Sequence, residues 1–148
     1  MSRTIHPIAG AIALAMIAGF WLATVLSELF APTAVVVAVK TAIPWGFILL
    51  IPALAATGGS GFAAAKGRRG GLVGAKIRRM PLIAANGLLV LIPSALFLAW
   101  KARHGQFDAV FYAVQALELL AGAGNLTLLA LNMRDGRRLS RSLQRARA

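Results

Sequence analysis

Four long apolar stretches constrain this chain more than any other feature, because each is long enough to cross a bilayer as a helix. A helix needs about 20 apolar residues to span a hydrocarbon core of about 30 Å. The charged fraction is only 14%, whereas a soluble domain usually has about 25%. We therefore predict an all-α fold, specifically an integral membrane four-helix bundle. Its predicted spans are residues 7–30, 33–57, 81–100 and 107–133.

The rest of the sequence predicts a single transmembrane domain over residues 1–148. Residues 58–80 are expected to form a basic loop rich in Gly and Arg, and residues 134–148 a basic tail. Pro81 is expected in the first turn of the third helix, where a missing N–H is harmless. Pro93 lies inside that helix and is expected to kink it.

The positions of Lys and Arg predict the orientation of the bundle. With both termini cytoplasmic, only Lys40, Lys101 and Arg103 of the 16 Lys and Arg residues fall outside. Short cytoplasmic loops carry an excess of these residues, so we predict N-in/C-in topology. Richness in Ala, Gly and Arg suggests a bacterial protein, hence one of the inner (plasma) membrane. The net charge of +12 flanks apolar stretches and forms no separate basic domain, so no nucleic-acid partner is predicted.

The fourth predicted helix carries a glutamate inside the membrane. Gln115, Glu118, Gly122 and Asn125 are spaced by three, four and three residues and therefore share one helix face. Glu118 lies about 15 Å below Asp108 at 1.5 Å per residue, which is near the midplane. An ionised carboxylate at that depth is costly unless it is paired or reached by water. We therefore expect this polar stripe to face the bundle interior.

Lys40 in the second helix is the best predicted partner of Glu118, because its long side chain can turn inward; Glu28 competes for it. A second, inner polar cluster is predicted from Asn86 of the third span and Thr57 of the second, which lie at a depth similar to Asn125. Three roles stay open for Glu118: a hydrogen bond between helices, a proton or cation relay or ligand site, and a contact with a partner subunit. The candidate intramembrane site comprises Glu118, Gln115, Asn125, Lys40 and Asn86.

The basic loop does not fit a nucleotide-binding P-loop. In "GGLVGAKI" the lysine is followed by Ile77, which offers no hydroxyl for a metal ion, and no strand precedes the loop. Attraction to anionic lipid headgroups, about 1 kcal/mol per basic residue, is the alternative we predict. The bilayer and its anionic lipids are thus predicted partners, together with a second copy of the chain or another membrane protein. The predicted headgroup contacts are Arg68, Arg69, Lys76, Arg78 and Arg79.

Cofactors and catalysis have little support in the sequence. The absence of cysteine excludes disulfides, thiolate metal sites and c-type haem attachment. His6 and His104 fall on opposite sides of the membrane, about 30 Å apart, so they cannot ligate one haem within a chain. We predict no cofactor and no metal, with haem held by one histidine or between subunits left open. No serine has a recognisable base beside it, so the chain is predicted not to be an enzyme.

The predicted function is that of a small multi-pass membrane protein, a non-enzymatic accessory or structural subunit of a membrane assembly. One alternative is a proton-coupled transporter or small-ligand carrier that uses Glu118. The other alternative is a membrane b-type haem protein.

The stretch "IPWGFILLIPALAATGGSGF" (residues 43–62) resembles uncharacterised small four-span inner-membrane proteins of proteobacteria. The resemblance covers mainly the second span and the overall length, and it implies no known activity. Small multidrug resistance transporters are similar in size, but their membrane glutamate lies in the first span. Here the first span has only Glu28, near its end, so that function is not carried over.

Overall fold

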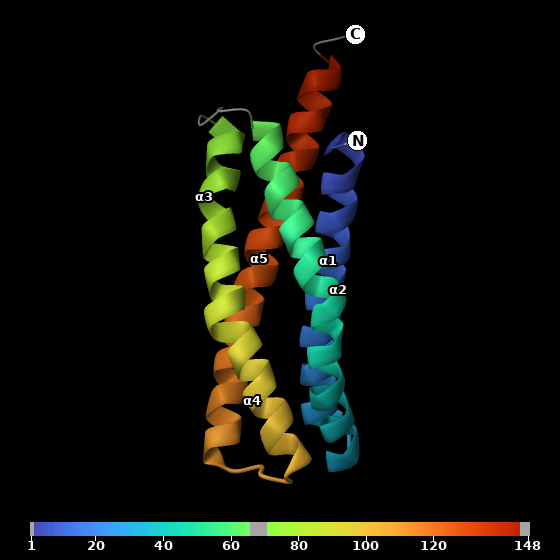
Figure 1. Cartoon of the computed structure of the whole chain (residues 1–148), viewed down its shortest axis with the longest axis vertical. Helices are drawn as coiled ribbons and strands as arrows, with labels where there is room; N and C mark the ends of the chain where they lie inside the picture. Colours follow the sequence, from blue (N-terminus) through green and yellow to red (C-terminus); the bar gives the residue numbers. More distant parts are fainter. Residues whose placement is uncertain (1, 66–70, 146–148) are drawn as a thin grey trace.

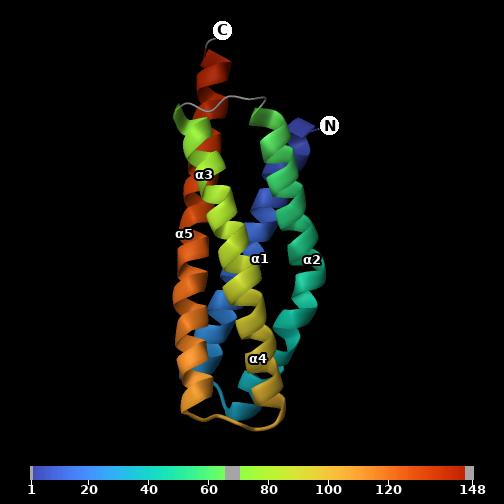
Figure 2. The same cartoon turned by 60° about the vertical axis from the view of Figure 1, so that its left-hand side comes forward.

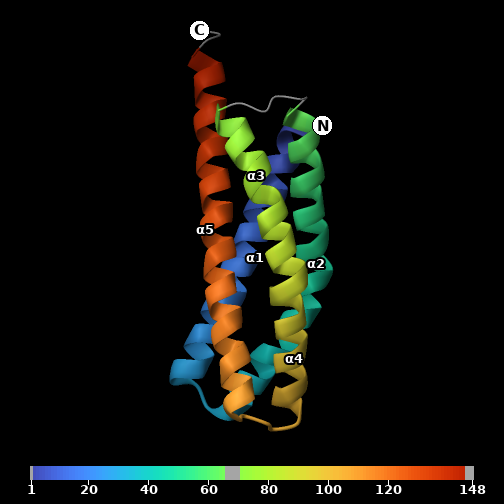
Figure 3. The same cartoon turned by 90° about the vertical axis from the view of Figure 1, so that its left-hand side faces the viewer.

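The structure is a computed structural model that describes residues 2–65 and 71–145, and these residues are helical except at two short turns. The helices form an antiparallel bundle (Figure 1). In Figures 2 and 3, the third helical segment continues without a break from α3 into α4 and lies beside α5. The elements are α1 (Ser2–Phe30), α2 (Thr33–Ala65), α3 (Gly71–Asn86), the π-helical turn η1 (Gly87–Leu91), α4 (Ile92–Arg103) and α5 (Ala109–Arg145).

Two ends of the bundle are distinguished below. The basic end is the one at which α1 begins, α2 ends, α3 begins and α5 ends. The short-loop end holds the turns at residues 31–32 and 104–108. Helix α1 contacts α2 and α5, while α4 contacts α2 and α5 from the other side.

Four helical segments are long and apolar enough to cross a membrane, which confirms the predicted all-α class and the predicted number of candidate spans. They are His6–Phe30, Thr33–Gly61, Val73–Arg103 and Ala109–Arg138, and they contain 18-residue stretches with mean hydropathies of 2.1, 2.1, 2.2 and 1.4, respectively. Large apolar side chains point away from the bundle, among them Trp45 at 70% exposure and Leu120 at 75%. A soluble monomer rarely exposes so much contiguous apolar surface, whereas lipid tails would cover it.

The helices extend further at the basic end than the sequence predicts. The expected loop over residues 58–80 is helical at 58–65 and again at 71–80. Glycine costs about 1 kcal/mol in a helix interior, so the glycines after Thr57 favour a loop in the sequence. Packing compensates here: Gly58 lies against Met80, and Gly61 lies against the His6 ring.

Pro81 lies inside α3, and not in its first turn as expected, because the basic residues before it are already helical. Pro93 is accommodated by η1, which immediately precedes α4. There the Ile92 N–H bonds to the Gly87 carbonyl, five residues back. The widened turn makes room for a residue that lacks an N–H and whose ring would clash with the preceding turn.

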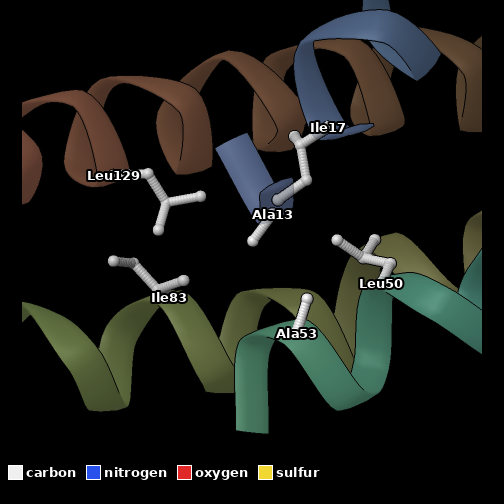
Figure 4. Packing of buried hydrophobic residues seen from close by; sticks show 6 residues of the cluster. All are labelled: Ala13, Ile17, Leu50, Ala53, Ile83 and Leu129. Carbon is white, nitrogen blue, oxygen red and sulfur yellow. The ribbon is translucent and has the colours of Figure 1, made fainter. Parts of the chain in front are cut away.

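All four spans meet in one apolar cluster near the middle of the bundle (Figure 4). Helix α5 contributes Leu129, which faces Ile83 of α3 across the interior. The buried alanines let neighbouring helices approach closely, as small residues do in membrane bundles. The cluster, called here the central layer, comprises Ala13, Ile17, Leu50, Ala53, Ile83 and Leu129.

Gly46 shapes the contact between α1 and α2. A Cβ atom at this position would lie 2.2 Å from Cζ of Phe20, so the phenyl ring occupies the space that a larger residue would need. Phe20 also packs edge-to-face on Phe47, with ring centroids 6.4 Å apart. The glycine therefore permits an aromatic contact that closes the α1–α2 interface.

The turn between α4 and α5 is fixed by Asp108. Its Oδ1 accepts a hydrogen bond from the Phe111 N–H at 2.9 Å, which caps the start of α5. Its Oδ2 pairs with the Lys101 ammonium of α4. The Lys101 hydrogen bond, and then the Phe111 N–H, lower the pKa of Asp108 below its ordinary value. Gly105, with φ of 65°, supplies the left-handed residue that ends α4.

Candidate functional site

The charged cluster, defined here as Glu28, Lys40, Gln115 and Glu118, lies in the half of the bundle next to the short-loop end. The Lys40 ammonium donates a hydrogen bond to Oε2 of Glu118 at 3.0 Å, so the predicted contact between these residues is present. Lys40 is only 1% exposed and Glu118 13%. Lys40 thus turns inward from α2, where its charge meets a carboxylate of α5.

Glu28 and Gln115 complete the cluster. Gln115 donates from Nε2 to the same Glu118 oxygen at 3.4 Å. Glu28, from α1, lies close enough to interact electrostatically with both Lys40 and Glu118. Lys40 therefore bonds to one carboxylate, that of Glu118, and has the second, that of Glu28, in its electrostatic neighbourhood.

Two buried acceptors of this cluster have no donor among the residues that the structure describes. They are Oε1 of Glu28 and Oε1 of Gln115. Buried polar atoms are nearly always hydrogen-bonded to protein or ordered water. The cluster is therefore short of donors, and a proton, a water molecule or a small cation would supply what is missing.

A small cavity of about 60 Å³ adjoins Glu118. Its walls are mostly apolar and include Thr24, Trp21 and the Glu118 side chain. A cavity of this size holds water but is far below the roughly 300 Å³ minimum typical of organic ligand sites. Only a small species can therefore reach the carboxylate through this space.

Trp21 joins α1 to α5 beside the same cavity, a contact that sequence patterns do not predict. Its indole N–H donates to the Leu119 carbonyl at 3.0 Å. A Cβ atom on Gly122 would lie 3.0 Å from Cδ1 of this indole. Gly122, which belongs to the predicted polar stripe, thus leaves room for the Trp21 ring against α5.

Asn86 and Asn125 form a separate contact and do not join the charged cluster. Asn86 donates from Nδ2 to Oδ1 of Asn125 at 2.9 Å and to the Ala121 carbonyl at 2.8 Å. Asn125 is 1% exposed and donates to the Ile83 carbonyl at 3.4 Å. The second polar cluster is therefore present, and it joins α3 to α5.

Thr57 does not belong to this asparagine pair, contrary to expectation. Its carbonyl accepts from Nδ1 of His6 at 3.0 Å, close to the basic end. Its hydroxyl bonds back to the Ala53 carbonyl of its own helix at 2.7 Å. Depth along the helices suggested the pairing, but the rotation of α2 turns Thr57 toward α1.

Two of the predicted headgroup contacts are engaged inside the bundle. Arg79 donates to Oδ2 of Asp135 at 2.7 Å, and Asp135 is only 3% exposed. Lys76 Nζ lies 2.6 Å from Nε2 of His6. These placements differ from the expected lipid contacts because α3 begins ten residues before Pro81, which brings its basic face against α1 and α5. Arg78 is exposed, as a headgroup contact requires, while Arg68 and Arg69 lie outside the described residues.

Comparisons with known proteins give no guide. No family model, curated protein or solved structure matches this chain. Its chemistry must therefore be read from its own residues. The two histidines lie at opposite ends of the bundle, His6 near the start of α1 and His104 just after α4.

Proposed function

We propose that this chain is a small bacterial inner-membrane protein, with both termini cytoplasmic, that binds and passes protons through its charged cluster. The observation that carries this proposal is the shortage of donors in that cluster. The Lys40 ammonium bonds to Glu118 and has Glu28 as a second acidic neighbour, and Glu28 and Gln115 each retain a buried acceptor atom without a donor among the described residues. Intramembrane acids of this kind are typical of proton relays.

The charge balance supports proton binding. With Glu28 and Glu118 ionised and Lys40 protonated, the cluster carries a net charge of −1 inside the membrane. One bound proton makes the cluster neutral. Two neighbouring carboxylates, here those of Glu28 and Glu118, favour binding of one proton between them because both cannot easily be ionised together. The cavity of about 60 Å³ beside Glu118 favours a proton or water over an organic substrate.

The position of the central layer supports a controlled path between the two faces. Ile17 and Leu50 line the small cavity beside Glu118, while Leu129 lines a larger cavity at the basic end. The central layer therefore borders both spaces. Such a layer would block continuous water, and a small shift of α5 would be needed for a proton to cross it.

The orientation within this proposal follows the basic residues. The described basic end carries Lys76, Arg78 and Arg79 on α3, and the positive-inside rule places such residues in the cytoplasm. The charged cluster would then lie in the outer half of the membrane. Exposed Arg78 would contact anionic headgroups on the inner side.

A second candidate is the non-enzymatic structural or accessory subunit. It is favoured by the polar contacts that join α5 to each other span, through Trp21, Lys40 and Asn86. In this reading Glu118 serves only to hold α2 against α5. Assembly with a second copy or another membrane protein belongs to the same candidate.

Proton flux separates the two candidates. The protein is reconstituted in liposomes that contain a pH-sensitive dye. A potassium diffusion potential then drives proton movement into the liposomes. We expect proton uptake in the wild type, its loss in Glu118→Gln and a reduction in Glu28→Gln, with Arg78→Gln as the control. Unchanged flux in Glu118→Gln would overturn the proton proposal. Native mass spectrometry of the same samples shows whether Glu118→Gln has instead lost a partner or an oligomer, which would support the structural candidate.

A further inference from the structure

A cavity of about 380 Å³ lies at the basic end, among α1, α2, α3 and α5. This volume is within the range of roughly 300–1,000 Å³ that is usual for small-molecule sites. It is separate from the charged cluster and shares no lining residue with the small cavity beside Glu118. The polar residues that line it are His6, Thr57, Lys76, Asn132 and Arg137.

Lys76 places an ammonium group at this cavity. Its Nζ lies 2.6 Å from Nε2 of His6, and 3.7 Å from where a Cβ of Gly136 would be. The glycine leaves room for the lysine against α5. An ammonium has three donors, and His6 is the one acceptor found for it among the described residues. Two N–H groups of Lys76 are therefore available to a ligand.

His6 is held as a neutral acceptor by its neighbours. Because an ammonium can only donate, Nε2 of His6 must accept from Lys76, which places the ring proton on Nδ1. That proton is donated to the Thr57 carbonyl at 3.0 Å, and the Ser60 hydroxyl oxygen lies at 3.0 Å as well. The positive charge at this point thus belongs to Lys76, and His6 orients it.

The cavity has more positive than negative charge. Arg137 also lines it, and the hydrogen bond found for its guanidinium is to the weak acceptor Met133 Sδ at 3.4 Å. The nearby carboxylate of Asp135 is already occupied by Arg79 at 2.7 Å and Arg134 at 3.3 Å. Within the described part of the chain, Lys76 and Arg137 therefore lack a carboxylate within ion-pair distance.

We propose that this cavity binds a phosphate group, held by Lys76 and Arg137 with Asn132 as a further donor or acceptor. A guanidinium and an ammonium together suit a phosphate, which offers several strong acceptor oxygens. Apolar walls contributed by Met80, Leu129 and Met133 accommodate an aliphatic portion next to it. The phosphate belongs either to an anionic lipid headgroup or to a free phosphate ester.

Two probes distinguish these sources. For the lipid, the protein is extracted from nanodiscs of phosphatidylcholine with phosphatidylglycerol, and native mass spectrometry counts the phosphatidylglycerol retained. For the free ester, glycerol 3-phosphate is titrated calorimetrically into protein in pure phosphatidylcholine nanodiscs. Retention of phosphatidylglycerol alone assigns the lipid, and binding of glycerol 3-phosphate assigns the free ester.

The variants Lys76→Gln and Arg137→Gln test the residues. We expect each to weaken binding of the successful probe by about tenfold or more, because each removes a charge-assisted hydrogen bond. Arg78→Gln and Arg138→Gln serve as matched controls, because these arginines are exposed, as Arg137 is, but do not line the cavity. Loss of a basic residue that only faces the membrane surface should change lipid binding by about fivefold.

Lys76→Arg guards against a folding defect, since it keeps the charge and should retain most of the binding. Far-UV circular dichroism checks the helicity of every variant. The proposal is overturned if the wild type binds neither probe, or if the cavity variants and the surface controls weaken binding equally. Proton flux is measured in a separate assay. A negative result there would not affect the conclusion about phosphate binding.

Discussion

Removal of Lys40 tests most directly what holds the charged cluster together. At 3.0 Å and an effective dielectric constant of about 20, the attraction between Lys40 and Glu118 is about 5 kcal/mol. Replacing one partner of a buried pair leaves the other charge uncompensated, at a cost of about 3–5 kcal/mol. We therefore expect Lys40→Met to lower the free energy of unfolding by about this amount. Glu28 would add to the loss, because it too depends on Lys40 for a positive neighbour.

The companion variant removes both charges. When a buried ion pair is replaced by apolar residues of similar size, stability is often unchanged or raised by about 1–4 kcal/mol. Lys40→Met combined with Glu118→Leu should therefore be more stable than Lys40→Met alone. Unfolding by sodium dodecyl sulfate in mixed micelles, followed by tryptophan fluorescence, gives the free energy for each protein.

This reasoning would be refuted if Lys40→Met lowered the free energy of unfolding only slightly, and if Glu118→Leu simply added its own loss. Hydrogen bonds between membrane helices contribute about 0.6 kcal/mol on average and about 1.7 kcal/mol at most. If Lys40→Met costs no more than that, and the double variant loses at least as much, Lys40 acts as an ordinary polar contact. Lys101→Met is the control, because Lys101 pairs with the exposed Asp108 at the end of the bundle.

Three further predictions concern packing, pH and the asparagine pair. Gly46→Ala should lower thermal stability by about 1–3 kcal/mol through overpacking against Phe20, and Phe20→Leu in the same chain should restore much of it. The lowered pKa of Asp108 means that its contribution to the start of α5 is complete above about pH 4 and is lost as pH falls through the lowered value. Hydrogen exchange in the first turn of α5 measures this, and Asp108→Asn should remove the pH dependence. Asn86→Leu should cost more than Asn125→Leu in detergent unfolding, because both hydrogen bonds of Asn86 are short, at 2.8 and 2.9 Å, whereas the bond that Asn125 donates to the Ile83 carbonyl is long, at 3.4 Å.

The sequence predicted the membrane class and the inward-facing charge pair for simple physical reasons. Apolar length identifies a span almost independently of how the helices pack. A glutamate and a lysine within spans are so costly alone that their mutual contact could be expected, as with Lys40 and Glu118. Pro93 predicts a kink in the third span, but it does not predict that the kink takes the form of a π-helical turn.

Contacts that depend on helix rotation were not predicted. The Arg79–Asp135 pair and the His6–Lys76 contact require residues 71–80 to be helical. The glycines and charged residues of this segment instead predict a loop. The contact between Trp21 and the Leu119 carbonyl could not be predicted, because the sequence does not distinguish one backbone carbonyl from another as an acceptor. Periodicity gives a face for each helix, but not which neighbour that face meets.

The contacts along α5 explain how one bundle could be both firmly packed and able to change its protonation. Trp21, Asn86 and Arg79 bind α5 at three levels without involving Glu118. Neutralising Glu118 would therefore leave most of the polar contacts of α5 intact, and Lys40 would keep Glu28 as a counter-charge. Removing Lys40 instead takes away the cationic neighbour that Glu28 and Glu118 have in common within the described part of the chain. This asymmetry predicts that Glu118→Gln remains assembled while Lys40→Met is the destabilised variant, as a proton-binding acid on an independently anchored helix requires.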